Sequence, residues 1–152
     1  MNDLLEIKIL CSKVCLLLAT ASDGTAYQFN DILYRLCISD FVDSNGEMNN
    51  ASVKNINSVL FYTKYLSHAL SRLNAFGLVI NEGGFVRKTY SCDLYYQRCM
   101  DSKNKSILAV IHQLSCTHKC CKDVESIEAK YKMLCEKYIE KKIKEEFEWV
   151  TL

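Results

Sequence analysis

The segment from residue 63 to residue 90 limits most strongly what this chain can fold into. Its first part carries apolar side chains at the spacing of an amphipathic helix. These side chains are Tyr65, Leu66, Ala69, Leu70 and Leu73, and Phe76 extends the stripe. Gly77 follows directly, and glycine commonly ends helices because it takes positive φ angles without steric cost. The pattern therefore predicts a helix that stops at Gly77.

A β-hairpin is predicted immediately after this helix. Residues 78–80 form a β-branched apolar run that is typical of a strand. The Gly83-Gly84 pair allows a tight reversal, and residues 85–90 return as a second, basic strand. A helix, a glycine stop and a hairpin in this order indicate a recognition helix followed by a wing.

The polar side of the predicted helix suits contact with nucleic acid, because its side chains are types that bond phosphates or base edges. They are Lys64, Ser67, His68, Ser71, Arg72 and Asn74. Residues 51–91 hold five Lys and Arg side chains against one acid, Glu82, although the whole chain has a net charge of only +1. A solvated helix with an ordinary hairpin would explain the periodicity but not this local charge. We predict that Arg87 and Lys88 contact phosphates.

Composition sets wider bounds. A chain of 152 residues suits one domain, with room for an appended helix. Hydrophobic residues make up 49% of it, enough for a core, yet no apolar run reaches the length of a membrane span. The first residues lack the basic region of a signal peptide, and nine cysteines, an odd number, argue against a disulfide scaffold. We therefore expect reduced thiols and a cytoplasmic protein.

The rest of the chain is predicted to be mainly helical, and the absence of proline permits long helices. Helices are expected at residues 3–19, 27–38, 53–62, 107–114 and 124–147, with Ser52 as the cap of the third. Residues 39–50 and 91–105 are expected to be irregular. Cys11 and Cys15 lie beside the stripe of the first helix, where buried cysteine behaves as a small hydrophobe, so we expect core residues there.

A cysteine and histidine cluster precedes the last helix, at Cys116, His118, Cys120 and Cys121. Iron–sulfur clusters and zinc both need several such ligands converging from one flexible loop. Neighbouring lysines would favour the thiolate form, and Cys92 and Cys99 could fold over as further ligands. Two alternatives stay open, a thiol redox switch and an unliganded cysteine-rich loop.

The predicted helix at residues 124–147 has an apolar stripe that a small domain would not bury alone. Its members are Val124, Ile127, Tyr131, Leu134 and Tyr138. A second copy of the chain is the simplest cover for it. We therefore predict a homodimer whose interface includes Ile127, Tyr131, Leu134 and Tyr138.

The ordered combination of these features resembles the IscR/NsrR-type winged-helix transcription regulators, which sense iron–sulfur clusters, nitric oxide or cysteine status. The similarity lies in four places: Lys64 to Leu66 with Leu70, Leu73, Gly77 to Val79 and Gly83 to Phe85; the segment from Ile107 to His112; the cysteines before a long helix; and the final Val150, Thr151 and Leu152. Relative to that family, residues 40–53 are an insertion, the wing is short and the cysteines are closely spaced.

The expected fold is mainly α with a small β-hairpin wing. Residues 1–91 would form a winged helix-turn-helix domain, residues 92–122 a cysteine-containing region and residues 123–152 a dimerisation helix. The expected function is that of a dimeric, sequence-specific DNA-binding regulator or repressor, with an iron–sulfur cluster, zinc or a thiol redox state as its signal. A winged-helix interaction or assembly module without DNA binding is the alternative. No enzyme is expected, because the sequence lacks a Gly-rich phosphate loop and the common hydrolase motifs.

Overall fold

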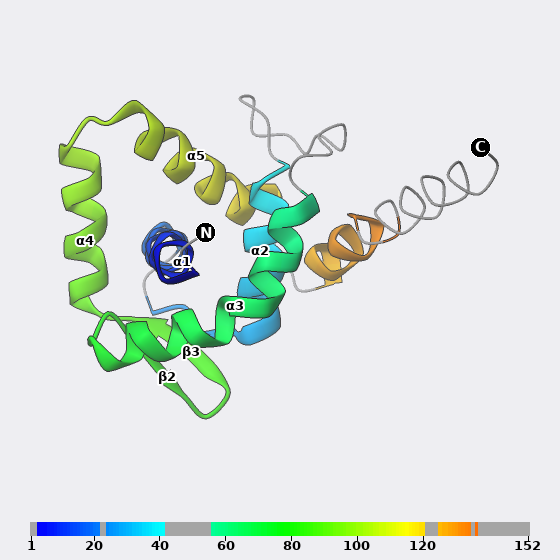
Figure 1. Ribbon diagram of the computed structural model, residues 1–152, viewed down its shortest axis with the longest axis horizontal. Helices are drawn as coiled ribbons and strands as arrows, with labels where there is room; N and C mark the ends of the chain where they lie inside the picture. Colours follow the sequence, from blue (N-terminus) through cyan, green and yellow to red (C-terminus); the bar gives the residue numbers. More distant parts are fainter. Residues whose placement is uncertain (1–2, 22–23, 42–55, 121–124, 135, 137–152) are drawn as a thin grey trace.

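The computed structural model describes residues 3–21, 24–41, 56–120, 125–134 and 136. The chain is mainly helical, with one small antiparallel sheet (Figure 1). Its elements, in order, are α1 (Asp3–Ala19), β1 (Tyr27–Gln28), α2 (Phe29–Ser39), α3 (Ile56–Ala75), β2 (Val79–Glu82), β3 (Phe85–Lys88), α4 (Tyr90–Asp101) and α5 (Lys105–Cys120). Residues 125–134 form a further helix. Among the described residues, none of these helices is both long and apolar enough to cross a bilayer.

Helix α1 is the centre of the fold. In Figure 1 it is seen end-on, encircled by α2, α3, α4 and α5, and it contacts all four helices and β3. Because neighbours surround it, four consecutive side chains from Cys15 to Leu18 are at most 2% exposed, as expected for the second half of this helix, which is apolar all round. The predictions of a helix at residues 3–19 and of Cys15 as a core residue are confirmed. Cys11, also predicted to be a core residue, is half-buried at the edge of the core.

The second predicted helix begins two residues late. Tyr27 and Gln28 form strand β1, which pairs with β3 through Tyr27–Val86 and Gln28–Phe85. A two-residue strand is too short to show a periodicity in the sequence. Because helical spacing follows it directly, the sequence pattern assigned these two residues to the helix. Helix α2 then buries most of its residues from Ile32 to its end at Ser39.

Helix α3 unites the helix predicted near residues 53–62 with the predicted recognition helix; residues 53–55 lie outside the described part. Its end is closed by two backbone hydrogen bonds, from Leu78 N to Leu73 O (2.9 Å) and from Gly77 N to Asn74 O (3.1 Å). These bonds, with φ of +76° at Gly77, form a Schellman motif. The predicted glycine stop is therefore confirmed.

The hairpin turns at Gly83 and Gly84, whose φ angles are +63° and +81°. Two successive positive φ angles define the turn type that best matches the twist of a two-residue hairpin. Strand β3 lies in the middle of the sheet, in the order β1-β3-β2. The second strand ends at Lys88 rather than at residue 90, because Tyr90 already belongs to α4.

Two predictions for the C-terminal half are wrong. Residues 91–105 are not irregular throughout, since α4 covers most of them; its buried side is made by Cys92 and Cys99 with half-buried tyrosines, so it lacks an aliphatic stripe. Helix α5 is also longer than residues 107–114 and includes the cysteine and histidine segment expected to be a loop. Asn104 caps it by accepting hydrogen bonds from the backbone of Ser106 (3.0 Å) and Ile107 (3.3 Å).

Candidate nucleic-acid interface

The outward side of α3 presents a continuous row of polar side chains. Lys64, Ser67, His68, Ser71 and Asn74 are exposed, and Arg72 is half-buried. They are exposed because the opposite side of the helix, with Leu66, Ala69, Leu70 and Leu73, is buried in the core. The amide oxygen of Asn74 also accepts a hydrogen bond from the backbone of Asn81 (3.1 Å). This bond ties the end of the row to the hairpin.

The two basic residues of the hairpin do not face the same way. Neighbouring residues on a strand point to opposite sides of the sheet, and Arg87 shares the outer side with its cross-strand neighbour Ile80. Lys88 instead makes an ion pair with Asp93 of α4, at 2.9 Å, and its side chain is only 12% exposed. Lys88 is therefore not part of the candidate interface, although its sequence suggested it, whereas Arg87 is exposed.

The charge of this region is locally positive. Within the described residues, Lys64, Arg72 and Arg87 form no ion pair. Glu82 is the single carboxylate in the sequence between residues 60 and 88. A surface with three uncompensated cations and one acid attracts polyanions.

Exposed apolar side chains occur at the end of α3 and on the hairpin, and the prediction made for one of them is wrong. Phe76 is 71% exposed, whereas we predicted that it extends the buried stripe. Phe76 comes directly after the last residue of α3. Because the helix has ended there, helical spacing no longer determines the direction of its side chain. Ile80 and Phe85 on the outer side of the hairpin are each 44% exposed.

The cysteine and histidine segment of α5 is built differently from this exposed surface. Cys116 is 5% exposed and packs in a small core with Ile38, Phe41, Ile127 and Leu134. The Nε2 atom of His118 donates a hydrogen bond to the Leu17 carbonyl at 3.0 Å. Residues two apart on a helix do not face each other, so Cys116 and His118 serve separate parts of the core.

A buried arginine network, which the sequence analysis missed, surrounds His118. Arg35 is 5% exposed; its Nε donates to Asp31 at 2.7 Å, and its Nη1 donates to the Thr117 carbonyl at 3.2 Å and to His118 Nδ1 at 3.1 Å. Because Nδ1 accepts this bond, His118 is neutral with its proton on Nε2. The available signal was the four-residue spacing of Asp31 and Arg35 within an otherwise apolar helix.

The surroundings of His118 oppose its protonation. Burial lowers the pKa of His118 below its ordinary value of 6.5, the hydrogen bond to Leu17 opposes this shift, and the positive charge of Arg35 adds to it. A second proton would have to lie on Nδ1, where Arg35 now donates. The neutral imidazole is therefore a structural link between α1, α2 and α5.

The cysteines predicted as further ligands lie elsewhere. Cys92 and Cys99 are buried on α4, and Cys92 donates a hydrogen bond to the Cys15 carbonyl of α1, at 3.2 Å. No group of three or more His, Cys, Asp or Glu side chains that could hold a metal occurs among the described residues. The side chain of Cys120 and all of Cys121 lie outside them. The described members thus do not form the predicted iron–sulfur or zinc site.

The members of the predicted dimer stripe that the structure describes are also covered within one chain. Ile127 is fully buried and Leu134 is 6% exposed, both against α2 and α5. Tyr131 stacks on Tyr34, with ring centroids 4.3 Å apart. The expectation that these side chains need a second copy is therefore wrong. Tyr138 lies outside the described residues, and the homodimer itself stays a prediction.

Comparison with known proteins does not add a family to these observations. No family model, no curated protein and no solved structure matches this chain. The resemblance to IscR/NsrR-type regulators consequently stays a prediction from the sequence.

Proposed function

We propose that this protein is a winged-helix transcription regulator that binds double-stranded DNA through α3 and the β2–β3 hairpin. The observation that carries the proposal is the exposed polar row on α3, which continues into the outward Arg87. The order of elements supports it as well. Winged-helix domains contain a first helix, a short strand, two further helices and a hairpin. This chain has the same order of elements, and the last strand of its hairpin, β3, pairs with the short strand β1.

In this proposal the outward side of α3 enters the major groove. That groove, about 12 Å wide, admits an α-helix. Ser67, His68 and Ser71 would meet base edges, where hydroxyl and imidazole groups exchange hydrogen bonds with donors and acceptors of the bases. Lys64 and Arg72 would meet the phosphates on the two sides of the groove.

The hairpin would lie along the neighbouring backbone. Arg87 projects from its outer side and would contact a phosphate, while the short Gly83-Gly84 turn keeps the hairpin compact. The cysteine sensor is not included in this proposal, because Cys116 and His118 already have separate places in the core.

Equilibrium binding to a random-sequence duplex tests this proposal, with fluorescence anisotropy at several salt concentrations. Three phosphate contacts, from Lys64, Arg72 and Arg87, predict a slope of log affinity against log salt of about −2.7. Absence of binding at low salt would contradict the proposal.

A second candidate function is an interaction module without DNA binding. The observation in its favour is the exposure of Ile80 and Phe85 on the outer side of the hairpin and of Phe76 just after α3, because exposed apolar side chains are available to a protein partner. The anisotropy experiment separates the two functions, since a module of this kind would not bind the duplex.

A further inference from the structure

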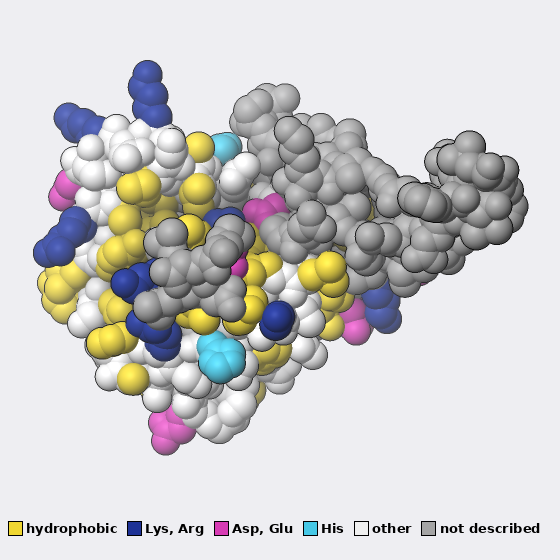
Figure 2. Space-filling view, viewed as in Figure 1, with side chains coloured by type: hydrophobic (Ala, Val, Ile, Leu, Met, Phe, Trp, Pro, Cys, Tyr) yellow, Lys and Arg dark blue, Asp and Glu magenta, His cyan; other side chains and the backbone are white. Residues whose placement is uncertain are grey.

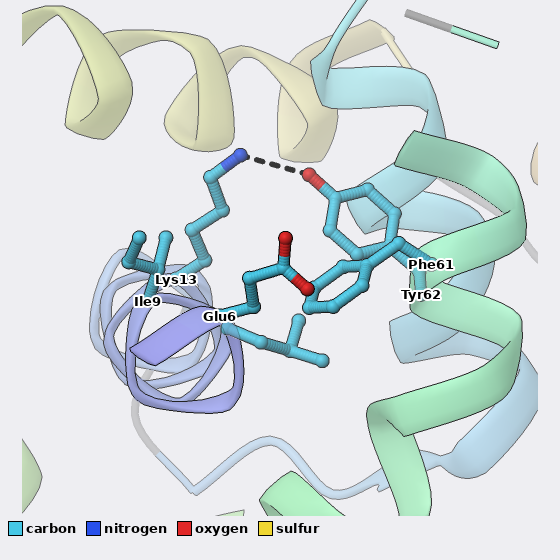
Figure 3. Close-up of a pocket in the computed structure, with 6 residues that line it drawn as sticks. Glu6, Ile9, Lys13, Phe61 and Tyr62 are labelled. Atoms are coloured by element: carbon cyan, nitrogen blue, oxygen red, sulfur yellow. Dashed lines mark hydrogen bonds between the residues drawn. The ribbon is translucent and has the colours of Figure 1, made fainter. Parts of the chain in front are cut away.

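A pocket of about 280 Å³ lies between α1 and α3 (Figure 3). It is lined by Glu6, Ile9, Leu10, Lys13, Phe61 and Tyr62. Hydrophobic side chains gather on the face of the molecule seen in Figure 2, with Lys and Arg side chains among them, and Ile9 is 52% exposed. The pocket therefore combines apolar walls with two charged side chains.

The charge of Lys13 is already compensated. Its Nζ donates a hydrogen bond to the Tyr62 hydroxyl at 2.8 Å and lies 3.5 Å from a carboxylate oxygen of Asp40. The Tyr62 hydroxyl in turn donates to the other Asp40 oxygen at 2.7 Å. The lysine ammonium also lies 5.4 Å from the centre of the Tyr62 ring. This closed triangle joins α1, α3 and the end of α2 and fixes one wall of the pocket.

Glu6 differs from Lys13 because, within the described part of the chain, it makes no hydrogen bond or ion pair. Its carboxylate points from α1 across the pocket toward the rings of Phe61 and Tyr62 (Figure 3). With Lys13 matched by Asp40, Glu6 gives the lining one negative charge that no described residue compensates. An anionic ligand would meet both Glu6 and Asp40 and is disfavoured.

We propose that this pocket binds a small organic cation, an amine carried on an apolar or aromatic body. The ammonium would pair with the Glu6 carboxylate beside the face of Phe61, where an aromatic ring attracts a cation. The apolar body would cover Ile9 and Leu10 and be removed from water. A volume of about 280 Å³ lies at the lower end for ligand pockets, which limits the ligand to a compact molecule.

Isothermal titration of the full chain with three probes of similar shape tests this site. Phenethylamine is the cation, phenethyl alcohol its neutral counterpart and phenylacetate its anionic counterpart. A charge-assisted hydrogen bond to Glu6 predicts that the amine binds about tenfold more tightly than the alcohol. In Glu6→Gln this preference is expected to disappear, because the amide carries no charge.

Glu125→Gln is the matched control, since it removes an exposed carboxylate of another helix and is expected to keep the full preference. Far-ultraviolet circular dichroism confirms that both variants are folded. The proposal is overturned if the wild-type protein does not bind the amine at millimolar concentration, if the amine binds no better than the alcohol, or if the preference survives Glu6→Gln. The titration contains no DNA, so its result is independent of the proposed function.

Discussion

The polar row on α3 and the histidine–arginine network between α2 and α5 use similar residue types for opposite purposes. On α3 the side chains of Lys64, Ser67 and His68 point into solvent. In the network Arg35, Asp31 and His118 are largely buried and bonded to one another or to backbone carbonyls. The first set is free to bind a ligand, whereas the second has its bonding capacity used inside the fold.

This difference shows that residue type alone does not locate a functional site. His118 and Cys116 suggested a metal centre from their spacing, yet each fills a position in the core. The prediction that the polar row on α3 is exposed to solvent has a firmer physical basis than the predicted metal centre. A helix with one buried stripe must expose its other side, so the exposure of Lys64 to Asn74 followed from the pattern itself.

The largest effect on this contrast is expected from Arg35→Met. The methionine would fit the apolar surroundings but leave Asp31 without its cation, and breaking a buried ion pair costs about 3–5 kcal/mol of unfolding free energy. Urea denaturation measures the loss. Lys64→Met on the exposed row is the control and is expected to change stability by less than about 0.5 kcal/mol. Equal losses in the two variants would remove the distinction between the regions.

Two substitutions of Cys116 distinguish a role in the core from a role as a metal ligand. The Cys116 Sγ atom lies 3.7 Å from His112 Nε2. Because a C–O bond is shorter than a C–S bond, a serine hydroxyl would lie farther from this nitrogen, among Ile38, Phe41 and Ile127, at a cost of about 1–3 kcal/mol. A valine is apolar and close in size, so Cys116→Val is expected to lose less than about 1.5 kcal/mol. Urea denaturation of both variants measures the difference. If Cys116 were a metal ligand, both substitutions would remove that ligand. Equal losses of unfolding free energy in Cys116→Ser and Cys116→Val would therefore contradict a core role.

His118 predicts a loss of stability in acid. Burial lowers the pKa of folded His118 below the unfolded value of 6.5, so the unfolded chain binds more protons as the pH falls through 6.5. Its contribution to stability is therefore present above that pH and declines below it, by at most about 1.4 kcal/mol per pH unit. Urea denaturation between about pH 7.5 and about pH 5.5 measures this decline. His118→Gln should flatten it, and an unchanged pH dependence in that variant would assign the decline to other groups.

Arg87 and Lys88 are expected to differ in DNA binding although they are neighbours in sequence. Arg87→Ala should reduce the magnitude of the salt slope by about 0.9, the value for one phosphate contact. Lys88→Ala should reduce it less, because Lys88 is paired with Asp93. Anisotropy titrations of both variants against one duplex provide the comparison. A larger change for Lys88 would show that its ion pair opens on the DNA.

The sequence predicted the elements that local physics determines. Helix α1, the stop at Gly77 and the Gly83-Gly84 turn follow from periodicity and from the backbone freedom of glycine. Strand β1 escaped because it has two residues and forms only by pairing with β3, nearly sixty residues away in sequence. Helix α4 escaped because cysteines and tyrosines, rather than aliphatic residues, form its buried side.

The candidate site was predictable to a similar degree. Strand alternation predicts that the side chains of Arg87 and Lys88 point in opposite directions. Helical spacing likewise predicts that Cys116 and His118 do not face each other. The partners of His118 could not be predicted, because Leu17 and Arg35 reach it only through the tertiary packing of three helices. The pairing of Lys13 with Asp40 could not be predicted either; among the described residues it leaves Glu6 as the charge of the pocket that has no partner.

A comparison of two charge-matched double variants tests most directly whether the outward side of α3 and the hairpin bind duplex DNA. Lys64→Ala with Arg87→Ala removes two cations from the proposed interface, and Arg98→Ala with Lys105→Ala removes two exposed cations from α4 and α5. Anisotropy with one duplex over a range of salt gives the slope for each. The first pair is expected to reduce the magnitude of the slope by about 1.8, and the second pair is expected to leave it unchanged. Equal reductions in both pairs, or a reduction only in the second, would contradict the proposed interface.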